Sequence, residues 1–168
     1  VYGLSVKFLA KMSPLAFFKG IAPAMITAFT TTSSNATLPV NIECCNKMGA
    51  EPEISSFVLP LGATINMDGT AIYQCVAAIF LAKCIGMDLG ITQMVTIVVT
   101  ATLASIGTAG TSGAGMIMLA MVLEAVGIPT TYIGIIYGID RLFDMGRTAL
   151  NVVGDASCAI CVNHWESK

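Results

Sequence analysis

The chain has 168 residues, of which 55% are hydrophobic and only 11% are charged, and its mean hydropathy is +0.81. Soluble domains carry about 25% charged residues, so this composition excludes an ordinary soluble fold and indicates a membrane protein. The net charge is −2 and no long basic run occurs, which argues against nucleic acid as a partner, because nucleic acid binding requires a basic surface.

Residues 1–12 are interpreted as the end of a preceding transmembrane helix. They lack the basic start, apolar centre and small-residue cleavage site of a signal peptide, so we expect the chain to begin within a longer protein. The six cysteines lie in or beside apolar segments and do not form the disulfide framework of a secreted domain. They are interpreted as small apolar residues; a metal or redox role for Cys158 and Cys161 is the alternative.

Residues 13–49 are predicted to form a first re-entrant hairpin. A helix can start at Ser13 and Pro14, and the polar string 30–37 interrupts it before a second helical segment at 38–48. Neither side has the roughly 20 apolar residues that a membrane-spanning helix needs. We therefore expect the tip to lie inside the membrane, where non-helical backbone survives only against protein or a watery cavity.

Two further interrupted segments follow the first hairpin. Residues 57–86 are long enough to span, but the sequence NMDGT at 66–70 places a carboxylate and a glycine in the middle, so we expect the helix to unwind there. Residues 91–127 are broken by a Gly- and Ser-rich stretch at 105–115 and are predicted to form a second hairpin. Two such tips, each followed by a polar-interrupted apolar helix, are typical of an inverted repeat with its substrate site at the interface.

A stripe of polar residues follows the last predicted helix, residues 129–163. Its members recur at steps of four, three, four and four, namely Asp140, Asp144, Arg147, Asn151 and Asp155. At roughly 3.6 residues per turn they share one helix face. The sequence thus predicts an all-α membrane protein with two re-entrant helical hairpins, one unwound transmembrane helix and one polar-striped transmembrane helix.

Ionisable groups at bilayer depth cost roughly 3 kcal/mol or more unless they are paired or hydrated, so they generally face a substrate or ion path. Asp68, Asn151 and Asp155 have no evident basic partner, and oxygen ligands of this kind suit a hard cation such as Na⁺. The planar fork of Arg147 can grip a carboxylate, and helix ends at the tips favour a second anionic group. A structural salt-bridge ladder, with Asp144 holding Arg147, is the alternative.

Four ordered motifs resemble the dicarboxylate/amino acid:cation symporters, also called the glutamate transporter family. They are SSNATLPV at 33–40, LPLGATINMDGT at 59–70, the glycine-rich second tip, and DMGRT with NV and GD within 144–155. The resemblance covers essentially the whole chain. It implies an elevator-type transport core that couples Na⁺ to symport of acidic amino acids, aspartate or glutamate, with the second hairpin as a gate.

The resemblance also implies which residues bind substrate and sodium. The substrate residues are Ser33, Ser34, Asn35, Thr70, Thr111, Gly115, Asp144, Arg147, Thr148 and Asn151. Asp144 would take the amino group, Arg147 the side-chain carboxylate and Asn151 the main carboxylate. The sodium ligands fall into three sets: Gly62, Asn66, Asn151 and Asp155; Thr64, Met67, Ser105, Ile106 and Thr108; and Asp68 with Asn66. The third set is incomplete, because its other ligands belong to an earlier helix.

The family further implies an integral, multi-pass protein of the plasma (inner) membrane, in contact with the lipid bilayer. Its homotrimer would form through scaffold helices that this chain lacks, so we expect the 168 residues to be inactive alone. Arg147 favours an acidic over a neutral amino acid, and Asp144 favours an amino acid over a C4-dicarboxylate; both remain alternatives within the family. Ser112 stands where many amino-acid members have proline, which leaves the stiffness of the gate open.

An enzyme and a channel are rival interpretations. Neither a G-x-S-x-G nor an H-E-x-x-H motif occurs, so we expect no intramembrane enzyme and no organic cofactor. A channel would conduct without saturating, whereas a carrier shows saturable, sodium-dependent uptake.

Overall fold

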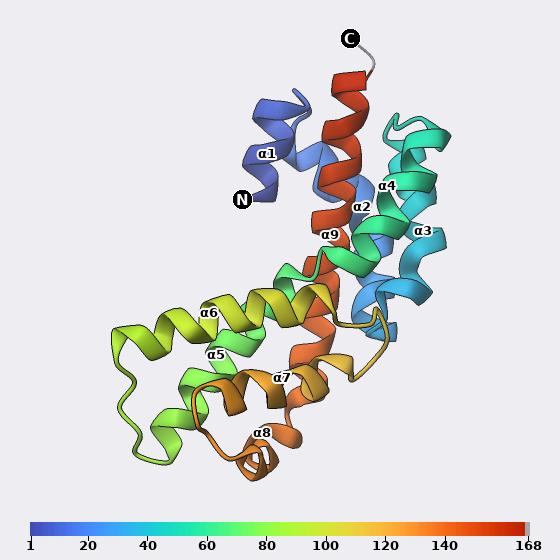
Figure 1. The fold of residues 1–168 in the computed structure, drawn as a ribbon. Helices are drawn as coiled ribbons and strands as arrows, with labels where there is room; N and C mark the ends of the chain where they lie inside the picture. The colour runs from blue at the N-terminus through green and yellow to red at the C-terminus, as the bar shows by residue number, and fades with distance from the viewer. Residues whose placement is uncertain (167–168) are drawn as a thin grey trace.

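The computed structural model describes residues 1–166, and every regular element in that range is a helix (Figure 1). This agrees with the all-α prediction. In chain order the elements are α1 (Tyr2–Leu9), α2 (Pro14–Thr31), α3 (Ser34–Lys47), α4 (Pro52–Ile65), α5 (Asp68–Cys84), α6 (Ile91–Ile106), α7 (Ala114–Ala125), the 3₁₀ helix η1 (Thr130–Ile133), α8 (Gly134–Tyr137) and α9 (Asp140–Glu166).

Helix α9 runs through the middle of the fold, and α1 to α5 and α8 pack directly against it (Figure 1). Around its C-terminal half, α1 to α4 form one hydrophobic core with fully buried Phe17 and Leu59. Beside its N-terminal half, α5, α6 and α7 form a second core around Leu81, Ile97 and Leu119. The polar middle of α9 therefore lies where the two cores meet.

The non-helical part of the first tip is shorter than the polar string at 30–37 in which it lies. Only Thr32 and Ser33 are non-helical, and Thr32 has a left-handed φ of 54°. Helix α3 begins at once because the Ser33 Oγ accepts a hydrogen bond from the Ala36 amide at 3.2 Å, which satisfies one of the unpaired amides at the helix start.

The break between α4 and α5 consists of Asn66 and Met67. Asp68 already opens α5, where a carboxylate is favoured by the positive end of the helix dipole. Taken as one stretch, Pro52–Cys84 is the one segment among residues 1–166 that is long and apolar enough to cross a membrane by length and composition.

The second hairpin consists of α6 and α7, joined by the non-helical residues 107–113. These helices have 16 and 12 residues, or about 24 and 18 Å, and the hydrocarbon core of a bilayer is about 30 Å thick. Neither helix is long enough to cross it alone.

The segment 129–163 contains η1 and α8 before α9 begins at Asp140. Pro129 is extended, and Gly134 and Gly138 lie in the short helical turns that follow; glycine is a poor helix former. The polar stripe consequently starts at the first residue of the long helix.

Candidate functional site

Both hairpin tips, the start of α5 and the middle of α9 enclose a very small cavity of about 10 Å³. Its walls include predicted site residues from each of these segments: Ser34, Thr70, Thr111, Asp144, Thr148 and Asn151. The structure therefore brings together residues that are as much as 117 positions apart, between Ser34 and Asn151.

Asn151 fixes the broken helix to α9. Its Oδ1 accepts a hydrogen bond from the Gly69 amide at 2.8 Å, and its Nδ2 lies 3.1 Å from the Met67 sulfur and 3.3 Å from Thr70 Oγ1. A β-carbon on Gly69 would lie 2.5 Å from the Arg147 carbonyl oxygen, so glycine is what allows the two helices to approach so closely.

Two carboxylates, the buried Asp155 and the half-buried Asp68, lie near this junction without a cationic partner. Asp155 is 2% exposed, and its Oδ1 accepts a hydrogen bond from Asn66 Nδ2 at 2.8 Å. The Oδ1 of Asp68 is buried and has no hydrogen-bond partner. Among the described residues no lysine or arginine forms an ion pair with either one. A buried anion is costly unless a charge compensates it, and a hard cation bound by oxygens would do so.

The predicted sodium ligands differ in how closely the structure gathers them. Gly62 lies so close to Asp155 that a β-carbon would be 2.6 Å from its Oδ1, and Asn66 bonds that carboxylate directly. Met67 and Thr108 line the small cavity.

The remaining members of the second set do not join that cavity. The hydroxyls of Thr64 and Ser105 donate to carbonyls of their own helices, and Ile106 is exposed. Within residues 1–166 no three acidic, histidine or cysteine side chains cluster as a metal site, so an ion here would depend on amide and backbone oxygens for most of its ligands.

Arg147 is buried between two carboxylates. Its Nε donates to Asp144 Oδ1 at 3.0 Å and its Nη1 donates to Asp140 Oδ1 at 3.3 Å. Nη2 lies 2.9 Å from Asp144 Oδ1, yet its orientation gives no hydrogen bond, so this contact is an ion pair only. The Tyr73 ring lies 4.5 Å from the guanidinium carbon, and its hydroxyl donates to Asp140 at 2.6 Å.

Tyr73 and Asp140 were missing from the predicted binding residues. Asp140 belongs to the predicted stripe, but its contact with Arg147 depends on the rotamer of a long side chain, which the sequence does not specify. Tyr73 follows Thr70 by three positions, which places both on one face of α5; that spacing was the available signal.

Main-chain and side-chain hydrogen bonds hold the two tips together. Ser33 Oγ donates to the Gly110 carbonyl oxygen at 2.8 Å, and the Asn35 amide donates to the same oxygen at 3.1 Å. Thr32 Oγ1 donates to Ser112 Oγ at 2.8 Å. The first tip therefore contacts the second directly.

The second tip also reaches α9. The Gly113 amide donates to Asp144 Oδ2 at 3.0 Å. A β-carbon on Gly115 would lie 2.7 Å from the Arg147 guanidinium carbon, so a larger residue at 115 would require the end of the Arg147 side chain to move.

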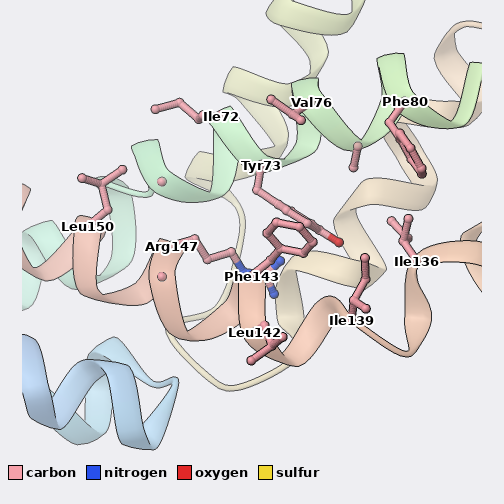
Figure 2. A pocket seen from close by; sticks show the side chains of 13 residues that line it. Ile72, Tyr73, Val76, Phe80, Ile136, Ile139, Leu142, Phe143, Arg147 and Leu150 are labelled. Carbon is pink, nitrogen blue, oxygen red and sulfur yellow. The ribbon is translucent and has the colours of Figure 1, made fainter. Parts of the chain in front are cut away.

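A larger cavity of about 480 Å³ lies on the other side of Arg147 and Tyr73. Apolar side chains of α5, α8 and α9 surround it, and Figure 2 shows Tyr73, Phe143 and Arg147 converging between α5 and α9. The two aromatic rings lie 5.8 Å apart. Arg147 thus lines both cavities, and Tyr73 and Phe143 contribute to an apolar wall on the side of the larger one.

Comparison with known proteins places this arrangement in a family. Residues 1–165 match the Sodium:dicarboxylate symporter family, a family of transporters and not of enzymes. An excitatory amino acid transporter of Caenorhabditis elegans is 47% identical over 156 residues, covering 92% of this chain and 31% of the relative.

Two mammalian proteins are similarly close. Excitatory amino acid transporter 3 of Mus musculus is 49% identical over 149 residues, 88% of this chain and 28% of the relative. Excitatory amino acid transporter 2 of Homo sapiens is 47% identical over 157 residues, 93% of this chain and 27% of the relative. The chain thus spans less than a third of the length of these relatives. By its match over nearly every residue, the chain belongs to the sodium:dicarboxylate symporter family.

Proposed function

We propose that this chain is the substrate- and sodium-binding part of a secondary active transporter that couples Na⁺ to the symport of acidic amino acids, aspartate or glutamate. The observation that carries the proposal is a buried arginine and a buried carboxylate without a cationic partner on the same stripe of α9: Arg147 is 6% exposed, whereas Asp155 is 2% exposed and unpaired by lysine or arginine in the described residues. An anion-binding group and a cation-binding group about 12 Å apart along one helix suit a solute and an ion that bind together.

The anionic solute is assigned to Arg147. Its Nη2 is buried and forms no hydrogen bond, which leaves a donor for an incoming carboxylate. Arginine binds carboxylates with two parallel hydrogen bonds, so the side-chain carboxylate of aspartate or glutamate fits this position. Asp144 would receive the amino group and Asn151 the main carboxylate.

The sodium ion is assigned first to Asp155, with Asn66, Asn151 and the Gly62 carbonyl as neighbours. The unpartnered Oδ1 of Asp68 supports a further ion near the same break. The set around Thr64, Met67, Ser105, Ile106 and Thr108 stays a prediction. Na⁺ is carried together with the solute, so it is cargo and no organic cofactor is proposed.

The membrane arrangement follows the same proposal. The shortness of α3, α6 and α7, which have 14, 16 and 12 residues, supports two re-entrant hairpins. Helix α9 has 27 residues and is long enough to cross, although its polar stripe requires a protein or water lining. We assign the parent to the plasma (inner) membrane as a multi-pass homotrimer whose transport core moves like an elevator against scaffold helices.

A C4-dicarboxylate is the second candidate solute, and two hydrogen bonds to Asp144 favour it. Asp144 already receives hydrogen bonds from Arg147 and Gly113, so its charge is compensated even when the solute has no ammonium group. A neutral amino acid fits less well, because it would leave the buried Nη2 of Arg147 without a hydrogen bond.

Uptake by the reconstituted full-length parent tests the proposal. Labelled aspartate, glutamate, succinate and serine are compared with and without Na⁺. We expect saturable, sodium-dependent uptake of aspartate or glutamate, with succinate and serine transported more weakly. Preference for succinate would select the dicarboxylate alternative, whereas flux that neither saturates nor depends on Na⁺ would indicate a channel and refute the proposal.

A further inference from the structure

The small cavity cannot admit a solute without movement of its walls. Its volume is about 10 Å³, and a single water needs roughly 10–15 Å³ measured in this way. Ser34, Thr70 and Thr148 are each at most 5% exposed. An amino acid can therefore enter or leave only when a wall is displaced.

The second tip is the wall that can move with least loss of helix structure. Residues 107–113 are non-helical, whereas the first tip has only Thr32 and Ser33 outside helices. What keeps the second tip in place therefore controls access to the site.

Three segments meet at one atom of the second tip, the Oγ of Ser112. Thr32 Oγ1 of the first tip donates to it at 2.8 Å, and Arg141 Nη1 of α9 also donates to it. The Ser112 hydroxyl itself points toward Asp144 Oδ2 at 3.5 Å. A single hydroxyl thus connects both tips with α9.

Arg141 differs from Arg147 in its surroundings. It is exposed, and within the described residues it forms no ion pair. Its position is next to Asp140 and off the polar stripe, so it faces the second tip rather than the cavity interior. Because a hydrogen bond from a charged donor is stronger than one between neutral groups, Arg141 is the strongest donor to Ser112 in this network.

We infer that Arg141 is a positioning residue that holds the second tip over the site through Ser112, with Thr32 as the partner on the first tip. We call these three residues the latch. The inference deepens the proposed function, on which its role in solute release rests. Opening of the second tip requires the Arg141–Ser112 and Thr32–Ser112 contacts to break, so their strength limits how fast a bound solute leaves.

The dissociation rate of labelled aspartate from the purified full-length parent, measured by chase with unlabelled aspartate, tests the latch. Arg141→Gln should raise this rate about fivefold to tenfold, the size expected for one partly exposed charged hydrogen bond, and Arg141→Lys should restore part of it. Ser112→Ala in the Arg141→Gln background should raise the rate further only by the contribution of the remaining Thr32–Ser112 contact, so the effects of the two single changes should add up to more than the effect of the double change. Lys19→Gln, which removes another exposed cation, is the matched control.

A second readout does not depend on solute binding. The buried position 34 is changed to cysteine (Ser34→Cys), and its modification by a membrane-impermeant thiol reagent is timed against the same protein without that cysteine. Arg141→Gln should accelerate the modification at least threefold. If Arg141→Gln accelerates the modification but the parent protein does not bind aspartate, the role of the latch is supported and the proposed function is refuted.

Unchanged dissociation and unchanged modification in Arg141→Gln would overturn the latch. Slower association of aspartate with an unaltered dissociation rate would overturn it too, because that result would assign Arg141 to electrostatic attraction of the anion.

Discussion

Replacing Arg147 by cysteine should lower the affinity for acidic solutes much more than the affinity for neutral ones. A hydrogen bond involving a charged group contributes roughly 1.5–3 kcal/mol, so a two-bond grip on a carboxylate contributes about 3–6 kcal/mol. Arg147 already donates to Asp140 and Asp144 and must release one of these bonds to bind the solute. We therefore expect a net contribution of about half of that value, about 1.5–3 kcal/mol, or an affinity loss for aspartate of about 12- to 150-fold.

Serine has no side-chain carboxylate, so its affinity should change by less than about 1 kcal/mol, or about fivefold. Both affinities are measured by competition against a labelled solute in the purified full-length parent at fixed Na⁺. Equal losses for aspartate and serine would refute the assignment of Arg147 to the side-chain carboxylate.

The control concerns folding. Removing one partner of a buried ion pair can destabilise a protein by about 3–5 kcal/mol, because Asp140 and Asp144 would keep uncompensated charges. Arg147→Lys retains the positive charge and loses the planar fork. We expect it to stay folded by size-exclusion chromatography and still to bind aspartate at least tenfold more weakly, which would attribute the loss to carboxylate recognition.

Three further predictions follow from the contacts around α9. Asp155→Asn should raise the Na⁺ concentration for half-maximal uptake severalfold, because the amide has no charge for the ion; an unchanged sodium dependence would remove Asp155 from the ion site. Gly69→Ala should reduce thermal stability and solute affinity together, since its β-carbon would lie 2.5 Å from the Arg147 carbonyl oxygen. A variant with the parental melting temperature would show that α5 and α9 leave room for a methyl group at this position. Tyr73→Phe removes the 2.6 Å hydrogen bond to Asp140 and retains the ring beside Arg147, so aspartate affinity should fall by about 1 kcal/mol in an equilibrium binding assay; a loss above about 3 kcal/mol would mean that the hydroxyl contacts the solute.

The polar stripe was the part of the site that could be predicted best. Its residues are local to one helix, so the helical repeat alone places them on one face. The structure buries all five of them: Asp140, Asp144, Arg147, Asn151 and Asp155. The break at the NMDGT motif was similarly local, because an acidic residue and a glycine interrupt an apolar run.

Contacts between distant segments could not be predicted in the same way. The pairing of Thr32 with Ser112 joins residues 80 positions apart, and no spacing rule relates two hairpin tips. Tyr73 reaches Asp140 across 67 positions and looks like an ordinary aromatic residue of an apolar helix. These contacts depend on how α5, α7 and α9 pack, which the linear pattern does not specify.

The length of the non-helical segment at the first tip could not be predicted from the polar pattern either. Eight consecutive polar or small residues at 30–37 suggested a long interruption, yet Ser33 caps α3 and Thr31, Ser34 and Thr37 are helical or begin the helix. Serine and threonine favour helix ends as well as loops, so polarity alone does not separate the two.

Calorimetric titration of aspartate into the purified full-length parent, first in Na⁺ and then in choline at equal ionic strength, tests most directly whether the buried carboxylates and Arg147 serve a cation and an anion that bind together. We predict that aspartate affinity falls at least a hundredfold in choline, the equivalent of about 2.7 kcal/mol of coupling. An affinity that is the same in both salts would contradict sodium-coupled binding at this site.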